Sequence, residues 1–169
     1  MIVLALSALV AGAQEKAQRY RELPNFHQVN ERLYRGGQPK DGGLERLAEL
    51  GIKTIVNLRG PGDGANNEEA EAKALGMRYF NLPLPNVGRP TDDQIARALE
   101  ILDDPVNAPV FVHCKRGADR TGVLVAAYRI KRDGWTSKQA IEEANRHGMG
   151  MIQFRKRGYI SDYYKEQRH

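Results

Sequence analysis

The sequence is poor in the residues that form cross-links and metal sites. It holds one cysteine among 169 residues, so no disulfide can form within the chain and no cystine pattern indicates its redox compartment. We find no spacing of cysteines and histidines typical of zinc, no glycine fingerprint of a nucleotide-binding loop and no internal repeat. We therefore expect neither a metal nor a cofactor. The length predicts a single domain with a substantial core.

The one cysteine lies in the segment 113–122, HCKRGADRTG, close to an arginine. The apolar run Pro109–Val112 before it predicts a buried strand, and Val123–Tyr128 after it predicts a buried helix. A tight loop between a strand and a helix directs backbone N–H groups and the positive end of the helix dipole at one point. This anion site favours the thiolate of Cys114, and the planar guanidinium of Arg120 can hold two oxygens of a phosphoryl group.

The segment 113–122 resembles the His-Cys-x5-Arg-Ser/Thr loop of the cysteine-dependent protein tyrosine and dual-specificity phosphatases. Further segments resemble bacterial members of that superfamily, especially the exported, periplasmic tyrosine phosphatases: Leu33–Pro39, Gly51–Arg59, and Gly134-Trp135 with Gln139–Glu143. The resemblance covers roughly residues 25–150. It implies a hydrolase with a dual-specificity phosphatase-like fold.

The chemistry expected of this loop is the transfer of a phosphoryl group to sulfur. The Cys114 thiolate attacks a phosphate monoester, and water hydrolyses the phosphocysteine intermediate. The loop amides and the Arg120 guanidinium stabilise the negative charge on the phosphoryl oxygens during the transfer. The residues expected to bind the substrate phosphate are Lys115, Arg116, Gly117, Ala118, Asp119 and Arg120. The resemblance implies that Thr121 donates a hydrogen bond to the cysteine sulfur, and we expect His113 to orient the loop.

A proton donor for the leaving group is harder to place. In the superfamily it is an aspartate on a loop that precedes the active-site strand, which points to Leu82–Asp93 here. Residues 83–90 contain no aspartate, so we predict Asp92 as the general acid. The alternatives are Asp93, Asp119, since some lipid-directed relatives carry an aspartate just before the loop arginine, and Asp63. Both Asp92 and Asp93 also fit the capping box that Thr91 and Gln94 would form.

Strands and helices are expected to alternate along the chain. The expected strands are His27–Arg35, Ile52–Leu58, Met77–Leu82 and Val110–His113, and the expected helices are 44–50, one that begins at Asn67 or Glu68 and ends at Leu75, 91–102, 123–128, 136–147 and 159–167. This order predicts an α/β fold with a central, mostly parallel sheet of four to five strands flanked by helices. The cysteine loop then lies at the carboxyl end of a strand, where ligands bind in open α/β sheets.

Three classes of function remain open for this loop. The leading one is a protein tyrosine or dual-specificity phosphatase. The basic pair Lys115-Arg116 also resembles relatives that act on inositol phosphates or phosphoinositides, and a phosphate-binding module without catalysis is a second class. A rhodanese-like sulfur transferase is the third, but its loops are a residue shorter than the five residues between Cys114 and Arg120.

The charge agrees with an anionic partner. The formal net charge is +5 and the isoelectric point is about 9.4, which suits an anionic substrate or surface. We expect a phosphorylated protein or a small polyanionic phosphate ester and no nucleic acid. The basic run Arg155–Arg157 either attracts anions or is solvated surface.

The N-terminal segment predicts export. Residues 1–13 are uncharged and apolar and end in Ala11-Gly12-Ala13, which resembles a cleavage site, although the usual basic start of a signal peptide is absent. The segment is too short to span a membrane. A buried N-terminal helix is the alternative, but no matching apolar stripe follows in 14–22. We expect a signal peptide over 1–13, a single phosphatase domain over 14–169, a periplasmic or secreted location and no stable membrane insertion after cleavage.

Overall fold

A five-stranded sheet forms the centre of the computed structural model, which describes residues 20–61 and 67–168. The strands are β1 (His27–Asn30), β2 (Leu33–Gly36), β3 (Thr54–Asn57), β4 (Arg78–Asn81) and β5 (Val110–His113). The helices are α1 (Gly43–Glu49), α2 (Glu68–Ala74), α3 (Asp92–Asp103), α4 (Asp119–Asp133), α5 (Ser137–Arg146) and α6 (Phe154–Glu166), with a 3-10 turn η2 (Pro105–Asn107). The expected signal peptide and Asp63 lie outside the described residues.

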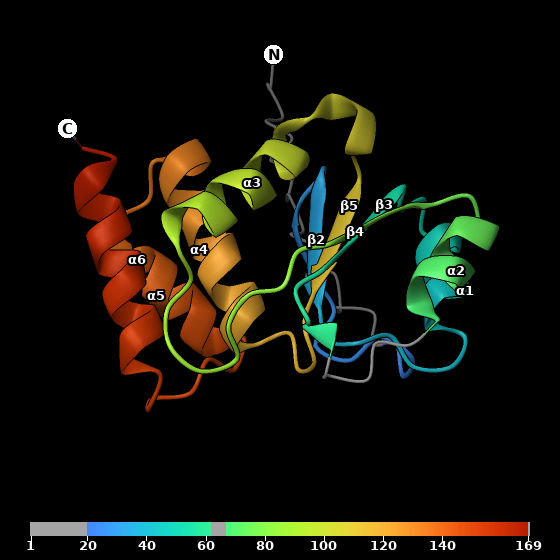
Figure 1. The fold of residues 1–169 in the computed structure, drawn as a ribbon, viewed down its shortest axis with the longest axis horizontal. Coiled ribbons are helices and arrows are strands. Elements are labelled where there is room, and N and C mark those ends of the chain that lie inside the picture. The colour runs from blue at the N-terminus through green and yellow to red at the C-terminus, as the bar shows by residue number, and fades with distance from the viewer. Residues whose placement is uncertain (1–19, 62–66, 169) are drawn as a thin grey trace, which may run out of the picture.

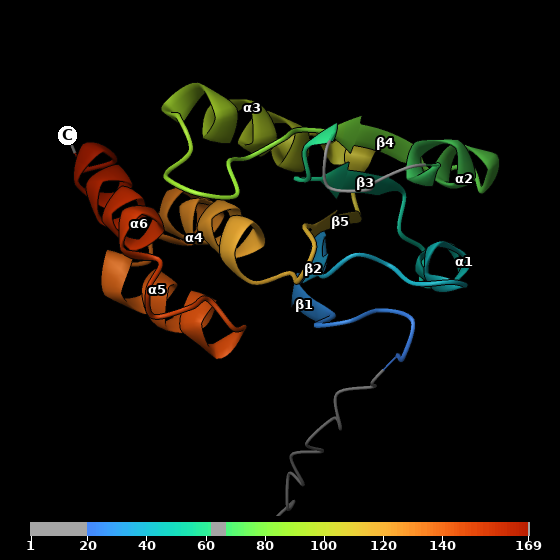
Figure 2. The ribbon, with the colours of Figure 1, turned by 60° about the horizontal axis from the view of Figure 1, so that its bottom comes forward.

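The sheet has the order β1-β2-β5-β3-β4. Three of its four strand pairings are parallel, and the pairing of β1 with β2 is antiparallel. All four residues of β3 and of β5 are buried, as expected for parallel strands covered on both faces. Helices α1 and α2 cover one face, and α3 to α6 cover the other (Figures 1 and 2). The predicted mostly parallel α/β sheet is therefore confirmed.

Alternating residues of the strands divide the core between these two faces. Ile55 and Phe111 pack with the leucines of α1, whereas Val56 and Val112 pack with α3 and α4. Helix α4 is buried from Arg120 to Tyr128 and ends at Gly134 with a positive φ of 68°, which is the usual C-terminal stop of a helix. None of the described helices has the length and apolar content that a membrane crossing requires.

The segment predicted as one strand over His27–Arg35 is instead a hairpin. Its two halves, β1 and β2, pair antiparallel with His27 opposite Arg35. The Asn30 side chain accepts a hydrogen bond from the Arg32 N–H at 2.9 Å, and such a local bond turns the chain. The prediction of a continuous strand was wrong because this side-chain turn interrupts the ladder.

The carboxyl ends of the three central strands meet at one edge of the sheet. Gly36 of β2 and Asn57 of β3 are both the register partners of His113 in β5. The N-terminal ends of α4 and α6 approach the same edge, at the bottom of Figure 1. This edge therefore collects the loop that contains Cys114, as the strand order predicts.

Candidate active site

The loop between β5 and α4 is held in shape by a close backbone contact at Gly117. This glycine has a φ of 70°, and a Cβ placed on it would lie 2.3 Å from the carbonyl carbon of Gly36 and 2.6 Å from the nitrogen of Gly37. A side chain at position 117 would therefore clash with backbone atoms that cannot move aside. The loop and the end of β2 fit together only with glycine here.

Three successive carbonyl groups of the loop are bonded to the chain that surrounds it. The Gln38 N–H donates to the Lys115 carbonyl at 3.2 Å. The Asn25 amide donates to the carbonyls of Arg116 and Gly117 at 3.1 and 3.2 Å. These carbonyl groups are engaged outside the loop, while the N–H groups of Gly117 and Thr121 face the Cys114 sulfur, as in an anion-binding nest.

Arg35 supports the same loop from below. Its Nη2 donates to the Gly117 carbonyl at 3.0 Å, and the side chain is buried. Its Nε and Nη1 have no hydrogen-bond acceptor among residues 20–61 and 67–168. Burial lowers the pKa of Arg35 to about 10, although the negative charges of Glu143 and Cys114 act in the opposite direction. A buried positive charge therefore lies beneath the cysteine loop.

The Cys114 thiol is buried and is stabilised as its anion. Burial alone would raise its pKa, but the nearby Thr121, the N–H of Gly117 and the charge of Arg120 outweigh burial and lower the pKa. Hydrogen bonds to the charged form of an acid have this effect. The sulfur is therefore poised as a nucleophile.

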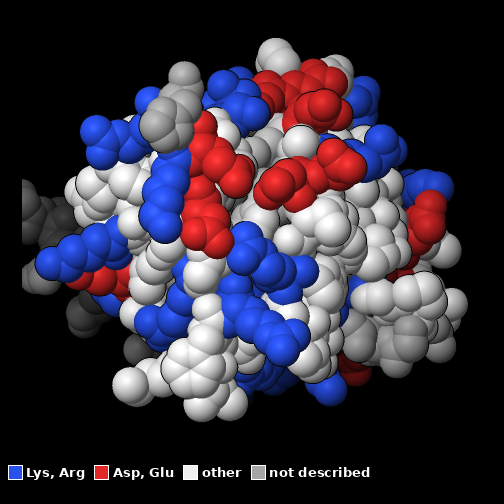
Figure 3. All heavy atoms as spheres, turned by 60° about the vertical axis from the view of Figure 1, so that its left-hand side comes forward, with Lys and Arg blue, Asp and Glu red and all other residues white. Residues whose placement is uncertain are grey.

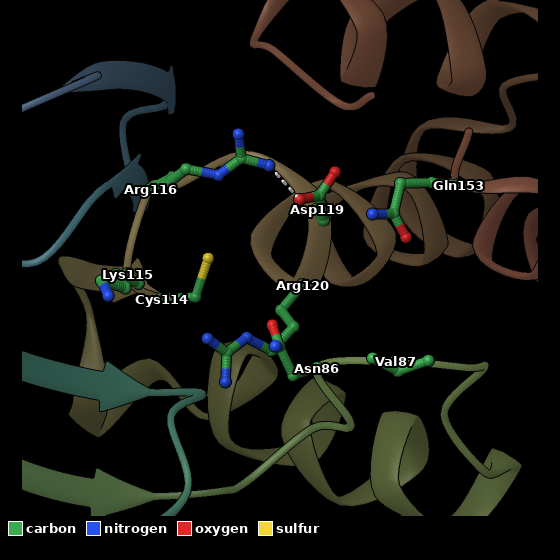
Figure 4. A pocket seen from close by; sticks show the side chains of 8 residues that line it. All are labelled: Asn86, Val87, Cys114, Lys115, Arg116, Asp119, Arg120 and Gln153. Atoms are coloured by element: carbon green, nitrogen blue, oxygen red, sulfur yellow. Dashed lines mark hydrogen bonds and ion pairs between the residues drawn. The ribbon is translucent and has the colours of Figure 1, made fainter. Parts of the chain in front are cut away.

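A pocket of about 440 Å³ opens over the sulfur. Its lining residues are Asn86, Val87, Cys114, Lys115, Arg116, Asp119, Arg120 and Gln153. In Figure 4 the Cys114 side chain projects into the space ringed by Arg116, Asp119 and Arg120. The Arg120 guanidinium is buried, and its Nη1 lies 3.5 Å from the Leu58 carbonyl, which ties it to the end of the neighbouring strand.

A buried polar cluster holds His113 behind the loop. His113 Nε2 lies 3.1 Å from Glu68 Oε1. Glu68 also accepts hydrogen bonds from Gln38 at 2.7 Å and from Asn57 and Tyr79 at 2.8 Å each. Although burial acts to raise it, the pKa of Glu68 is lowered by His113, Tyr79 and Gln38. The cluster joins α2, β3, β4 and β5 and gives His113 a positioning role.

Of the aspartates predicted as the general acid, only Asp119 lines the pocket in the described part of the chain. Asp119 lines the pocket, and its carboxylate accepts hydrogen bonds from Arg116 at 2.5 Å and from the Gly150 N–H at 3.1 Å. Asp92 and Asp93 are exposed on the first turn of α3 and do not line it. The carboxylate of Asp92 instead adds to the effect of burial in raising the pKa of Tyr159.

Lys156 is a residue that the sequence reasoning did not single out. It lies in α6, is only 1% exposed, and donates to the Asn86 carbonyl at 2.8 Å and to the Gln153 side chain at 3.3 Å. Burial lowers its pKa, while the charges of Asp119 and Cys114 act against this. Both of its partners line the pocket, so Lys156 fixes one wall of the site. In the sequence, its place within the basic run Arg155–Arg157 is typical of a solvated surface residue.

No metal centre accompanies these groups in the described part of the chain. Among residues 20–61 and 67–168, no three side chains of His, Cys, Asp or Glu are placed to hold a metal ion. The site thus consists of a thiolate, an arginine, backbone N–H groups and a surrounding set of cations. This is the arrangement of a cysteine-dependent phosphatase loop.

Comparisons with known proteins agree with this class. Residues 14–162 match the family model described as "DSP-PTPase phosphatase fused to NAD+ Kinase", and the chain belongs to this family. The match confirms the superfamily predicted from the loop at 113–122.

The similar proteins include both a dual specificity protein phosphatase and an inositol diphosphatase. The chain is 32% identical over 127 residues to the dual specificity protein phosphatase TpbA of Pseudomonas aeruginosa, covering 75% of this chain and 56% of that protein. It is 31% identical over 128 residues to the inositol diphosphatase DSP3 of Arabidopsis thaliana, covering 70% and 60%. The chain thus spans somewhat more than half the length of these relatives.

Solved structures support the same fold. The catalytic core of the PP-IP phosphatase SIW14 from S. cerevisiae, in complex with citrate, aligns with a TM-score of 0.75 at 26% identity, covering 86% of this chain and 90% of that one. The dual-specificity phosphatase-like architecture predicted from the sequence is confirmed.

Replacing Thr121 is expected to weaken the Cys114 thiolate. Iodoacetate reacts with the thiolate, so the rate of inactivation falls as the pH drops through the pKa of Cys114. We expect a midpoint below the usual range for cysteine in the wild type and at higher pH in Thr121→Ala, because the hydroxyl donor is lost. Thr121→Ser keeps the hydroxyl and is the control. Equal midpoints in Thr121→Ala and wild type would contradict the assigned contact.

Removing the Lys156 ammonium is expected to displace the pocket wall at Asn86. We expect Lys156→Met to lower kcat/KM for a soluble aryl phosphate by roughly ten- to a hundredfold, since small misplacements in a site are costly. The measurement is made well below the unfolding temperature of the variant. Lys165→Met, on the exposed side of the same helix, should leave kcat/KM unchanged. Wild-type activity in Lys156→Met would rule out this positioning role.

Proposed function

We propose that the chain is a cysteine-dependent phosphatase that hydrolyses phosphate monoesters. The observation that supports this best is the buried thiol of Cys114, whose pKa is lowered at the base of a pocket lined by Arg120. A nucleophile and an anion-binding group share one loop, and a tetrahedral phosphate fits between them. Protein tyrosine and dual-specificity substrates are the first class to test, in line with the name of the relative TpbA.

The reaction has two steps in this proposal. The Cys114 thiolate forms a bond to phosphorus as the bond to the leaving oxygen breaks, and the leaving oxygen takes up a proton. Water then attacks the phosphocysteine, which releases inorganic phosphate and restores the thiolate. The loop N–H groups and Arg120 hold the charge of the equatorial oxygens in both steps, and their fixed positions avoid reorganisation during the reaction.

Asp119 is the proton donor that the described pocket favours. Of the pocket-lining residues in the described chain, Asp119 is the one carboxylic acid. Its partner Arg116 is exposed for about two thirds of its side chain, so a polyanionic substrate can draw the guanidinium away and leave the carboxyl next to the leaving group. We therefore prefer Asp119 to Asp92, which the sequence reasoning had selected.

Inositol phosphates are the second candidate substrates. Lys115 and Arg116 are exposed cations on the pocket lining, and additional phosphate groups on a compact substrate would bind such cations. Two of the similar proteins are named for this substrate type, the inositol diphosphatase DSP3 and the PP-IP phosphatase SIW14. A phosphate-binding module without catalysis is the remaining alternative.

Export is part of the proposal. The uncharged, apolar composition of residues 1–13 and the Ala11-Gly12-Ala13 end support a cleaved signal peptide. The phosphatase would then act in the periplasm or outside the cell.

Turnover is expected to depend on Cys114 and Arg120. Wild-type protein should release phosphate from p-nitrophenyl phosphate, and Cys114→Ser should abolish release while still binding phosphate. Arg120→Lys is expected to lower kcat/KM by roughly a hundred- to a thousandfold, because a point charge replaces a two-pronged donor. Phosphate binding without turnover in the wild type would favour the binding module, and thiosulfate:cyanide activity would favour a sulfur transferase.

The effect of Asp119→Asn on substrates with different leaving groups is expected to identify the proton donor. An alkyl leaving group needs protonation far more than a nitrophenyl one, so Asp119→Asn should slow phosphoserine peptides about a hundredfold and p-nitrophenyl phosphate much less. Asp92→Asn and Asp93→Asn are matched carboxyl-to-amide controls and should not show this difference. A selective loss in Asp92→Asn instead would restore the sequence-based assignment. Inositol phosphates tested beside these peptides identify the preferred class.

Cleavage of the N-terminal segment can be tested by expression of the full chain in a Gram-negative host. We expect the protein in the periplasmic fraction with its N-terminus near residue 14, as determined by mass spectrometry of the intact protein. Deletion of 2–13 should retain the protein in the cytoplasm with unchanged activity. An uncleaved protein in the cytoplasm would contradict export.

A further inference from the structure

The most exposed large apolar side chains of the described residues gather at the pocket. Val87, Met151, Ile152 and Phe154 are 73–85% exposed, whereas the other three such residues, Leu50, Leu75 and Val106, are 36–53% exposed. Val87 itself lines the pocket, and so does Gln153, which lies between Ile152 and Phe154 in the chain. Two segments, the loop before α3 and the turn that leads into the first residue of α6, therefore carry apolar side chains to the edge of the site.

The chain around the pocket opening also carries exposed cations, of which Arg116 is paired with Asp119 and Arg89 with Asp162. Residues 83–90, 114–118 and 147–158 contain no aspartate or glutamate. Their exposed basic residues are Arg89, Lys115, Arg116 and Arg155. In Figure 3 the acidic side chains gather mainly in the upper half of the face shown, and the lower half is mostly basic and uncharged. We call these four basic and four apolar residues the pocket rim.

Neither the fold nor the reaction explains the apolar part of the rim. Exposed apolar side chains lose the free energy that burial provides, and four of them at one edge form more than the scattered exposure normal for a protein surface. A small inositol polyphosphate offers no apolar surface to cover them. The rim therefore indicates a larger partner that is both anionic and apolar.

We propose that the pocket rim docks on an anionic phospholipid bilayer and that the pocket takes a phosphomonoester headgroup presented there. The proposal rests on the proposed phosphatase function for its second half. A bilayer interface accepts apolar and aromatic side chains among the acyl chains while its anionic headgroups attract lysine and arginine. The rim offers both kinds of side chain around the opening through which the substrate enters.

The exposure of the apolar side chains favours a bilayer over a peptide. A bound peptide usually lies in a groove whose lining side chains are partly covered by their neighbours. Met151, Ile152 and Phe154 are each exposed over nearly three quarters of their surface or more, so they project from the surface. Projecting side chains on turns enter a soft interface without needing a complementary shape.

Docking can be measured without turnover. The probes are vesicles of phosphatidylcholine alone and of phosphatidylcholine mixed with phosphatidylglycerol, and the readout is co-sedimentation of the full chain. We expect binding to the anionic vesicles, weaker binding at high salt, and a loss of affinity of at least about tenfold in the double variant Ile152→Ser/Phe154→Ser. Val106→Ser is the matched control, because Val106 lies in η2 before the amino end of β5, at the opposite edge of the sheet.

The variants also separate docking from catalysis. Both the double variant and Val106→Ser should keep wild-type kcat/KM for p-nitrophenyl phosphate, which shows that they are folded. A phosphatidylinositol monophosphate in anionic vesicles should be hydrolysed at least about tenfold faster than its water-soluble deacylated form, and the double variant should abolish this preference.

Several results would overturn the proposal. It fails if wild-type protein binds neither vesicle, or if the double variant binds as tightly as wild type. It also fails if the double variant loses activity on a soluble phosphopeptide while its vesicle affinity is unchanged, since the rim then binds protein. Cys114→Ser should still dock, so a failure of catalysis is recognised separately from a failure of docking.

Discussion

The contact between the Gly117 backbone and the end of β2 is the constraint on which the site depends. The two chains approach so closely that a Cβ at position 117 would lie 2.3 Å from the Gly36 carbonyl carbon. This contact sets the curvature of the loop, and the curvature decides which way its N–H groups point. The sheet thus determines the chemistry, since the shape of the loop is set by strand packing. The bonds from Asn25 and Gln38 to the loop carbonyls then keep that shape.

The charged side chains around the loop occupy distinct positions. The nucleophile lies inside, the guanidinium of Arg120 lies beside it, and Arg35 and Lys156 lie buried behind the loop and behind the pocket wall. The buried carboxylate of Glu68 is kept apart from the pocket, where it engages His113. The phosphate position is therefore surrounded by positive charge together with the carboxylate of Asp119, whereas the buried negative charge of Glu68 supports the scaffold.

The strand–loop–helix unit was predictable because its information is local. The apolar runs on both sides of HCKRGADRTG define the buried elements, and the alternation of strands and helices defines the sheet. The hairpin in the first predicted strand was not predictable from alternation, because a side-chain bond of Asn30 makes the turn. Glu68 resembles an ordinary acidic residue at a helix start, and only the folded chain brings His113 to it. Lys156 and Asn86 are 70 residues apart, so no local pattern reveals their bond.

The unpaired nitrogens of Arg35 link occupancy of the site to the stability of the fold. This buried guanidinium has only part of its hydrogen-bonding capacity satisfied among the described residues, and burying such a charge has a cost. An anion bound in the loop above would add to the negative charges of Glu143 and Cys114, which already favour the charged guanidinium. Ligand that binds only the native state stabilises it, by about 2.7 kcal/mol at a hundred times its dissociation constant. A phosphate that binds in the loop therefore also stabilises the folded domain against heat.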